Sequence, residues 1–311
     1  MADNITGLHH ITVIAGDPQE NLDFYVGVLG MRLVKKTVNQ DVPGTYHLFY
    51  ADGAAHAGTD LTFFPWPDMP PGQAGVGLTV EVALAVPRGG LGYWADRLAR
   101  HGVQTTPANR FGERLLTFAD PHGLRLALVE TTDPRDFTPW AKSAVPETQQ
   151  IRGLHGVSLL ERNAVPTTDF LVNTLGFEEV GEEDGWRRFA LAGGRSGRVV
   201  DIKQLPSERQ GTWGTGSVHH VAWRVPDEQS QLTVQTRVQS AGRRPTPVID
   251  RFWFKSVYFR EPGGVLFEVA TDGPGFGVDE PLDELGGTLV LPPWLEPKRS
   301  QIEASLQPLH V

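Results

Sequence analysis

Two pairs of adjacent histidines and one glutamate are the residues of this sequence best suited to chemistry. His9 and His10 interrupt an apolar run near the start of the chain, and His219 and His220 interrupt a similar run much later. Neighbouring side chains of a strand point to opposite faces, so only one histidine of each pair is expected to face a given cavity. Glu268 lies within a third apolar run, where a buried charge needs a partner or a metal.

We interpret the second histidine of each pair as the one that faces the cavity. His10 precedes an Ile-Thr-Val run as His220 precedes Val-Ala-Trp, so the two assignments hold or fail together. With Glu268, they would place two neutral imidazoles and one carboxylate on one side of a metal ion. That ligand set leaves coordination positions open, which suits Fe(II) with an organic substrate and O₂ side by side; Mn²⁺, Zn²⁺ or Ni²⁺ could occupy the same ligands.

The composition is that of an ordinary globular chain and gives no sign of nucleic-acid or membrane binding. The 311 residues are 40% hydrophobic and 21% charged, and the net charge of −9 argues against nucleic acids and anionic membranes as partners. No window approaches the roughly 20 apolar residues of a membrane span, and the N-terminus does not resemble a signal peptide. Cysteine is absent, which excludes disulfides and thiolate sites and is compatible with a cytoplasmic protein, as we expect this one to be.

The elements that must position these residues follow a pattern that occurs four times. Each copy begins with a strand near residue 7, 78, 153 or 218, continues with a helix, and ends with three further strands. Gly7-Leu8-His9-His10-Ile11 aligns with Gly153-Leu154-His155-Gly156-Val157. The predicted fold class is therefore α+β, with four βαβββ units paired into two cupped mixed β-sheet barrels.

The predicted domain boundaries follow from this repeat. Residues 1–140 would form an N-terminal domain of two units, and residues 152–272 a C-terminal domain of two units, with the polar segment 131–151 as the linker. Residues 273–311 are expected to form a tail whose helix packs on the outside of a domain or on a partner subunit. A homo-oligomer is therefore one expectation for the assembly.

The alignment of the four units indicates which of them can hold a metal. The first-strand position is filled by His10, Glu81, Gly156 and His220, and the last-strand position by Thr62, Ala127, Lys203 and Glu268. Only the first and fourth units together supply two histidines and a carboxylate, so one cup is expected to be functional and the other mainly structural. We interpret Glu81 as the partner of a nearby arginine, and His47 as structural or exposed.

The sequence resembles the vicinal-oxygen-chelate superfamily, which includes glyoxalase I and the extradiol dioxygenases. The resemblance covers nearly the whole chain and is strongest to ring-cleaving dioxygenases that act on hydroquinones, including the chlorinated hydroquinone 1,2-dioxygenases. The segments that carry it are Leu8-His9-His10-Ile11-Thr12, Tyr46-His47-Leu48-Phe49-Tyr50-Ala51-Asp52, Val218-His219-His220-Val221-Ala222 and Leu291-Pro292-Pro293-Trp294-Leu295-Glu296.

This resemblance implies an activity and a set of site residues. Fe(II) would be held by His10, His220 and Glu268, and the surrounding functional positions match His9, Thr12, His219, Arg251 and Tyr258. The implied enzyme inserts both atoms of O₂ into a hydroquinone or related phenolic ring, chlorinated rings included, as in the degradation of aromatic compounds. Arg251 would stabilise negative charge on a phenolate or on oxygen, and Tyr258 and the outer histidines would exchange protons.

Two other functions stay open at this point. A glyoxalase-like or isomerase-like metalloenzyme could use the same scaffold, but it usually has a second carboxylate where this chain has Thr62. A non-catalytic metabolite-binding protein of the same fold would need no metal, whereas one cup here carries a complete ligand set. A small aromatic substrate and O₂ are the expected partners.

Overall fold

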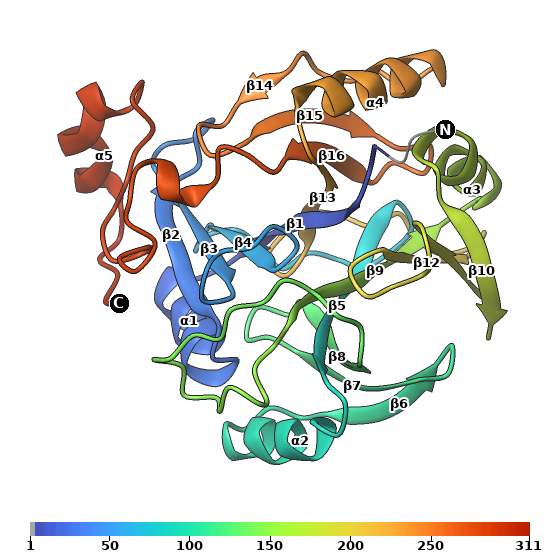
Figure 1. Ribbon diagram of the computed structural model, residues 1–311, viewed down its shortest axis with the longest axis horizontal. Coiled ribbons are helices and arrows are strands. Elements are labelled where there is room, and N and C mark those ends of the chain that lie inside the picture. The colour runs from blue at the N-terminus through green and yellow to red at the C-terminus, as the bar shows by residue number, and fades with distance from the viewer. Residues whose placement is uncertain (1–3) are drawn as a thin grey trace.

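A computed structural model describes residues 4–311. The expectation that the chain has no signal peptide rests partly on the first three residues, which lie outside the described part. The strands form two eight-stranded mixed sheets, which lie side by side in Figure 1. Their strand orders are β14-β15-β16-β13-β1-β4-β3-β2 and β10-β11-β12-β9-β5-β8-β7-β6. The predicted α+β class with two cupped sheets is confirmed.

The first sheet combines the first sequence unit with the fourth. Its strands are β1 (Gly7–Ala15), β2 (Arg32–Val38), β3 (Tyr46–Ala51), β4 (Asp60–Pro65), β13 (Val218–Val225), β14 (Ile249–Asp250), β15 (Lys255–Arg260) and β16 (Leu266–Thr271). The two units meet where β1 pairs antiparallel with β13. The sheet thus brings the two histidine pairs onto adjacent strands.

The second sheet combines the second unit with the third. Its strands are β5 (Leu78–Pro87), β6 (Thr106–Arg110), β7 (Glu113–Ala119), β8 (Arg125–Thr131), β9 (Gly153–Glu161), β10 (Glu178–Glu183), β11 (Trp186–Ala190) and β12 (Val199–Gln204). A tight turn with positive φ at Phe111 and Gly112 joins β6 to β7. The division into domains 1–140 and 152–272 stays a prediction.

Each unit carries one helix between its first and second strands. These are α1 (Pro18–Leu22), α2 (Leu91–Arg100), α3 (Val165–Phe170) and α4 (Glu228–Ser240); π-helical turns at Asp23–Val28 and Leu171–Leu175 extend α1 and α3. Asp17 and Asp227 cap α1 and α4 by accepting hydrogen bonds from backbone N–H groups of the first turn. In Figure 1, α4 lies over β15 and β16, and its buried Gln231 donates to backbone carbonyls of both strands.

A glycine opens β1 and another opens β9 because the two sheets approach each other closely there. Gly7 has φ +155°, and a Cβ added to it would lie 2.8 Å from the carbonyl oxygen of Gly197. Gly153 has φ +123°, and its Cβ would lie 2.8 Å from the carbonyl oxygen of Gly58. Only glycine combines this backbone conformation with so close a backbone approach. The repeated glycine of the sequence pattern therefore marks the contact between the two sheets.

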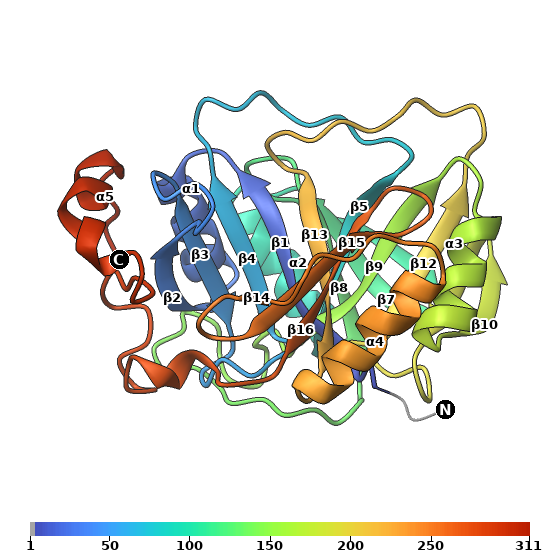
Figure 2. The same ribbon diagram turned by 90° about the horizontal axis from the view of Figure 1, so that it is seen from above.

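After β16 the chain leaves the sheets and forms a tail. Its elements are the 3₁₀-helical turns Phe276–Val278 and Glu296–Lys298 and the helix α5 (Arg299–Ser305). Figures 1 and 2 show α5 beside β2, where Val38 packs with Leu291, Leu295 and Ile302. The fully buried ammonium group of Lys35 on β2 bonds to the tail residues Asp279, at 2.8 Å, and Glu280. Within residues 4–311, no helix has the length and apolar character needed to cross a membrane.

Candidate metal centre

Both histidine pairs lie at β-bulges in the pairing of β1 with β13. Relative to the opposite strand, β1 has one extra residue at His9 and β13 has one at His219. A bulge interrupts the alternation of side chains along a strand. The Nδ1 atoms within each pair lie 2.8 Å apart, so the first histidine lies beside the second. His10 and His220 line the cavity described below and His9 and His219 do not, which agrees with the expectation that one histidine of each pair faces it.

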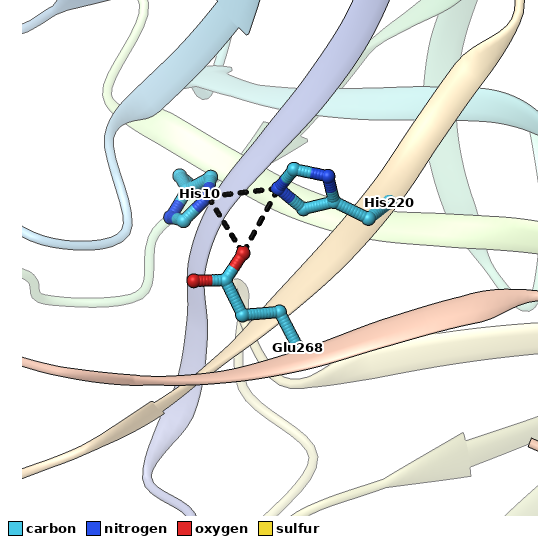
Figure 3. Close-up of side chains that lie close together, drawn as sticks. All are labelled: His10, His220 and Glu268. Atoms are coloured by element: carbon cyan, nitrogen blue, oxygen red, sulfur yellow. Dashed lines mark hydrogen bonds and ion pairs between the residues drawn. The ribbon is translucent and has the colours of Figure 1, made fainter. Parts of the chain in front are cut away.

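The second histidines converge with Glu268, as Figure 3 shows. The Nε2 atoms of His10 and His220 are 3.2 Å apart. Glu268 Oε2 lies 3.3 Å from His10 Nε2 and 2.9 Å from His220 Nε2. The three side chains come from β1, β13 and β16, which are consecutive neighbours in the sheet, although the first and last lie near opposite ends of the sequence.

The arrangement fits a divalent cation. Adjacent corners of an octahedron with ligand distances of about 2.1 Å lie roughly 3.0 Å apart, close to the spacings between these three donor atoms. Glu268 is fully buried, and among the described residues its Oε2 makes no hydrogen bond. A buried carboxylate oxygen without a hydrogen bond costs free energy unless a cation satisfies it. His10, His220 and Glu268 could therefore hold a metal on one side and leave its other side open.

The outer histidines can fix the tautomer of the inner ones. Burial, followed by the neighbouring ligand histidine, lowers the pKa of His9 and of His219 to about 3, so both rings stay neutral. A neutral outer ring can accept a hydrogen bond on Nδ1 from the Nδ1–H of the inner ring. His10 and His220 would then have unprotonated Nε2 atoms, the form that binds a metal.

Ser256 is a site residue that the sequence reasoning missed. It is fully buried on β15, and its hydroxyl donates a hydrogen bond to Oε1 of Glu268. Burial raises the pKa of Glu268, and His10 and His220, when they are protonated, lower it well below the usual range. Only the register of β15 against β16 exposes this role, since a serine in a strand carries no signal of its own.

A cavity opens beside the three ligands and contains about 380 Å³ of space not filled by atoms, part of it open to solvent. Aromatic side chains supply much of its wall: Phe49, Phe64, Trp253, Phe254 and Tyr258. The polar groups are the two ligand histidines with Asn39, Gln40, Asp41, His47 and Arg251. An apolar cavity with a few convergent polar groups is typical of a site for a small organic molecule.

Arg251 and Tyr258 lie together on one side of this cavity. The Arg251 guanidinium lies 5.5 Å from the Tyr258 ring centre, and it bonds to both carboxylate oxygens of Asp41 at 2.9 and 3.2 Å. Burial, with the Glu268 charge as the second cause, raises the pKa of Tyr258, so the phenol keeps its proton. Asp41 is largely exposed, and an exposed ion pair contributes little, so Arg251 can exchange this partner for a bound anion.

His47 lines another part of this cavity and is linked to Thr12 through Thr62. The Thr12 hydroxyl lies 2.7 Å from that of Thr62, and His47 Nε2 lies 2.9 Å from the same Thr62 hydroxyl. His47 lines the cavity, so its interpretation as a structural or exposed residue has to be corrected. The sequence did contain an indication of this role. His47 lies two residues before Phe49 in a short strand, so the two side chains share one face.

The second sheet has an equivalent cluster of residues, but arginines fill it. Glu81 forms two hydrogen bonds with Arg110, which confirms the interpretation of Glu81 as an arginine partner. Asp201 pairs with Arg188 at 2.7 and 2.9 Å. In the strand register it is Asp201, not Lys203, that corresponds to Glu268, because the alignment by sequence was two residues out of register. Both carboxylates are therefore already paired with guanidinium groups.

The chain belongs to the Glyoxalase/Bleomycin resistance protein/Dioxygenase superfamily, whose sequence model matches residues 7–128 and 153–269. Within it, the relatives are ring-cleaving dioxygenases. A Bacillus subtilis protein with the provisional name ring-cleaving dioxygenase MhqO is 45% identical over all of this chain and 99% of its own length. The chlorohydroquinone/hydroquinone 1,2-dioxygenase of Sphingobium indicum is 33% identical, with 97% of this chain and 96% of that protein covered.

Solved structures agree with this assignment. The crystal structure of a provisionally named dioxygenase from Bacillus subtilis has a TM-score of 0.95 and 44% identity, covering 100% of this chain and 99% of that one. The structure of glyoxalase I from Zea mays has a TM-score of 0.64 and 16% identity, covering 86% of this chain and 92% of that one. At this identity the likeness shows only that the two proteins share a fold. The prediction of an enzyme of the ring-cleaving dioxygenase class is confirmed.

Proposed function

We propose that the protein is an Fe(II)-dependent, extradiol-type dioxygenase that inserts both atoms of O₂ into a hydroquinone or related phenolic ring. The observation that carries the proposal is the convergence of His10, His220 and Glu268, with one buried carboxylate oxygen left for a cation. The named activity of the Sphingobium relative supports a hydroquinone as the substrate. Fe(II) in such a site would supply electron transfer between an aromatic diol and O₂.

The side chains around the ligands would each have a definite task. The guanidinium of Arg251 would stabilise the ionised oxygen of the substrate, and the protonated Tyr258 could donate a hydrogen bond beside it. The aromatic walls would hold the ring and exclude water. Thr62 argues against a glyoxalase-like site, because a hydroxyl bonded to Thr12 stands where a second carboxylate would be needed. We propose a cytoplasmic enzyme, with a homo-oligomer as its assembly.

The first test combines metal analysis with an oxygen electrode. Protein purified without air should contain iron and consume O₂ in a 1:1 ratio with hydroquinone, and chelation should abolish the uptake until Fe(II) is restored. Glu268→Gln removes the charge but keeps the size of the side chain, and it should bind iron at least roughly tenfold more weakly. The proposal would have to be abandoned if that variant kept the iron affinity and the activity of the parent.

A further inference from the structure

A hydrogen-bonded chain of three side chains on β1, β4 and β3 ends at His47, which lines the cavity. Thr12 bonds to Thr62 at 2.7 Å between the hydroxyl oxygens, and Thr62 bonds to His47 Nε2 at 2.9 Å. In the sheet order, β4 and β3 lie on one side of the ligand strands, and β15 with Tyr258 lies on the other. His47 on β3 therefore gives the cavity a polar group that is separate from Arg251 and Tyr258.

The donors and acceptors of this chain can be assigned from burial. Thr12 is fully buried, and among the described residues its hydroxyl bonds only with Thr62. If His47 Nε2 carried the proton and donated to Thr62, the Thr62 hydroxyl would donate to Thr12, and the Thr12 proton would be buried without an acceptor. A buried donor without an acceptor is rare and destabilises the folded protein. In the opposite direction Thr12 donates to Thr62 and Thr62 donates to Nε2, so every proton in the chain has an acceptor.

The second arrangement determines the tautomer of His47. With Nε2 as an acceptor, the proton of a neutral ring must be on Nδ1. Burial, then the nearby His10, holds the pKa of His47 well below its ordinary value, so the ring is neutral. Its centre lies 3.9 Å from that of Phe49 and 4.3 Å from that of Phe64, which restricts rotation. His47 is thus a fixed, neutral N–H donor on a cavity-lining residue.

We propose that His47 is a catalytic residue that donates a hydrogen bond from Nδ1 to the second hydroxyl oxygen of a bound aromatic diol. The identity of the diol rests on the proposed function, whereas the donor is a property of the cavity. A neutral donor suits a neutral hydroxyl, while Arg251 on the other wall suits the ionised oxygen. Thr62 acts through His47 and is a positioning residue.

The decisive experiment compares two probes that differ by one hydroxyl group. Binding of hydroquinone and of phenol to the Zn²⁺-loaded protein is measured by calorimetry without O₂, for the wild type and His47→Phe. The wild type should prefer hydroquinone by up to about tenfold, the usual effect of one neutral hydrogen bond. His47→Phe should lose that preference and keep its affinity for phenol. His47→Asn, whose amide can donate from nearly the same place, should recover most of it.

A matched control and a second measurement complete the test. His101→Phe makes the same change at an exposed histidine and should leave both affinities unchanged. Side-chain ¹⁵N NMR of labelled histidines, with His47 identified from the spectrum of His47→Phe, should detect the Nδ1–H form. An Nε2–H form, equal affinities of the wild type for the two probes, or an unchanged preference in His47→Phe would each overturn the proposal. If binding depends on His47 but the iron enzyme consumes no O₂ with any diol, the proposed function fails and the donor role stands.

Discussion

The two oxygens of the Glu268 carboxylate have different surroundings. Oε1 accepts a hydrogen bond from Ser256, whereas Oε2 faces His10 and His220 and has no hydrogen-bond partner within residues 4–311. The serine therefore prevents the carboxylate from rotating and leaves one oxygen for a cation. At the scale of single residues, the site depends as much on such outer partners as on the three ligands.

Removing this hydroxyl should weaken metal binding without changing the ligand set. We expect Ser256→Ala to lower the affinity for Fe(II) or Zn²⁺ by about 10–100-fold, the usual cost of losing an outer hydrogen bond. Competition with a chromophoric chelator measures this affinity, and Ser240→Ala, at the exposed end of α4, is the control. An unchanged affinity in Ser256→Ala would mean that the Glu268 carboxylate is held by other contacts.

The sequence predicted the three side chains that converge, because their residue types are unusual where they occur. A charge or a histidine pair within an apolar run has few structural explanations, whereas Ser256 and Asp41 are ordinary in a strand or a loop. His47 was misjudged because its role depends on Thr62, a partner fifteen positions away that becomes its neighbour only through strand pairing. Residue types therefore predicted which side chains converge better than they predicted the hydrogen-bond partners of those side chains.

The strands impose an equivalence between two positions of the first sheet. Thr62 pairs with Thr12 across β4 and β1, and Glu268 pairs with Ala222 across β16 and β13. Since Thr12 and Ala222 each follow a ligand histidine by two residues, Thr62 and Glu268 occupy matching places around the centre. The alignment of the four units predicted that Thr62 is equivalent to Glu268. In the third unit the alignment was two residues out of register, so that it selected Lys203 in place of Asp201. Strand boundaries in sequence are too uncertain to define a register.

The equivalence predicts the effect of a carboxylate at position 62. We expect Thr62→Glu to add a fourth ligand and to fill an open coordination position, so that metal binds more tightly while O₂ uptake falls at least roughly tenfold. Chelator competition and the oxygen electrode measure the two effects. Thr62→Gln, of similar size but uncharged, controls for the lost hydrogen bond to His47. If both variants lost activity equally and bound metal alike, position 62 would not face the metal.

At the scale of the whole molecule, two buried glutamates stand where the sheets meet. Glu161 ends β9 in the second sheet, and Glu261 begins the turn between β15 and β16 in the first. Burial, followed by the charge of Glu261, raises the pKa of Glu161 from 4.5 to about 8. The folded protein therefore keeps a proton on Glu161 at neutral pH that the unfolded chain would release. The stability that protonated Glu161 contributes is fully present below the pKa of glutamate in the unfolded chain. That stability is lost as the pH rises to the folded-state pKa of about 8.

The effect of Glu161 on the pH dependence of stability can be measured by replacing it with glutamine, which cannot ionise. Relative to Glu161→Gln, the wild type should lose free energy of unfolding between pH 5 and pH 8.5, by at least about 1 kcal/mol. Urea unfolding of the metal-free proteins at both values gives the difference, and Glu178→Gln on the exposed edge of β10 is the control. A difference that does not change with pH would show that Glu161 is ionised in the folded protein.

The pairing of β1 with β13 and β16 also has a consequence for biosynthesis. His10 on β1 is synthesised well before its partner Glu268 on β16, because the other strands of both sheets lie between them in the sequence. A nascent polypeptide without β16 lacks the carboxylate of the centre and cannot bind a metal with all three side chains. Metal binding would have to follow the synthesis of β16, and a product that stops before β16 would have an incomplete site.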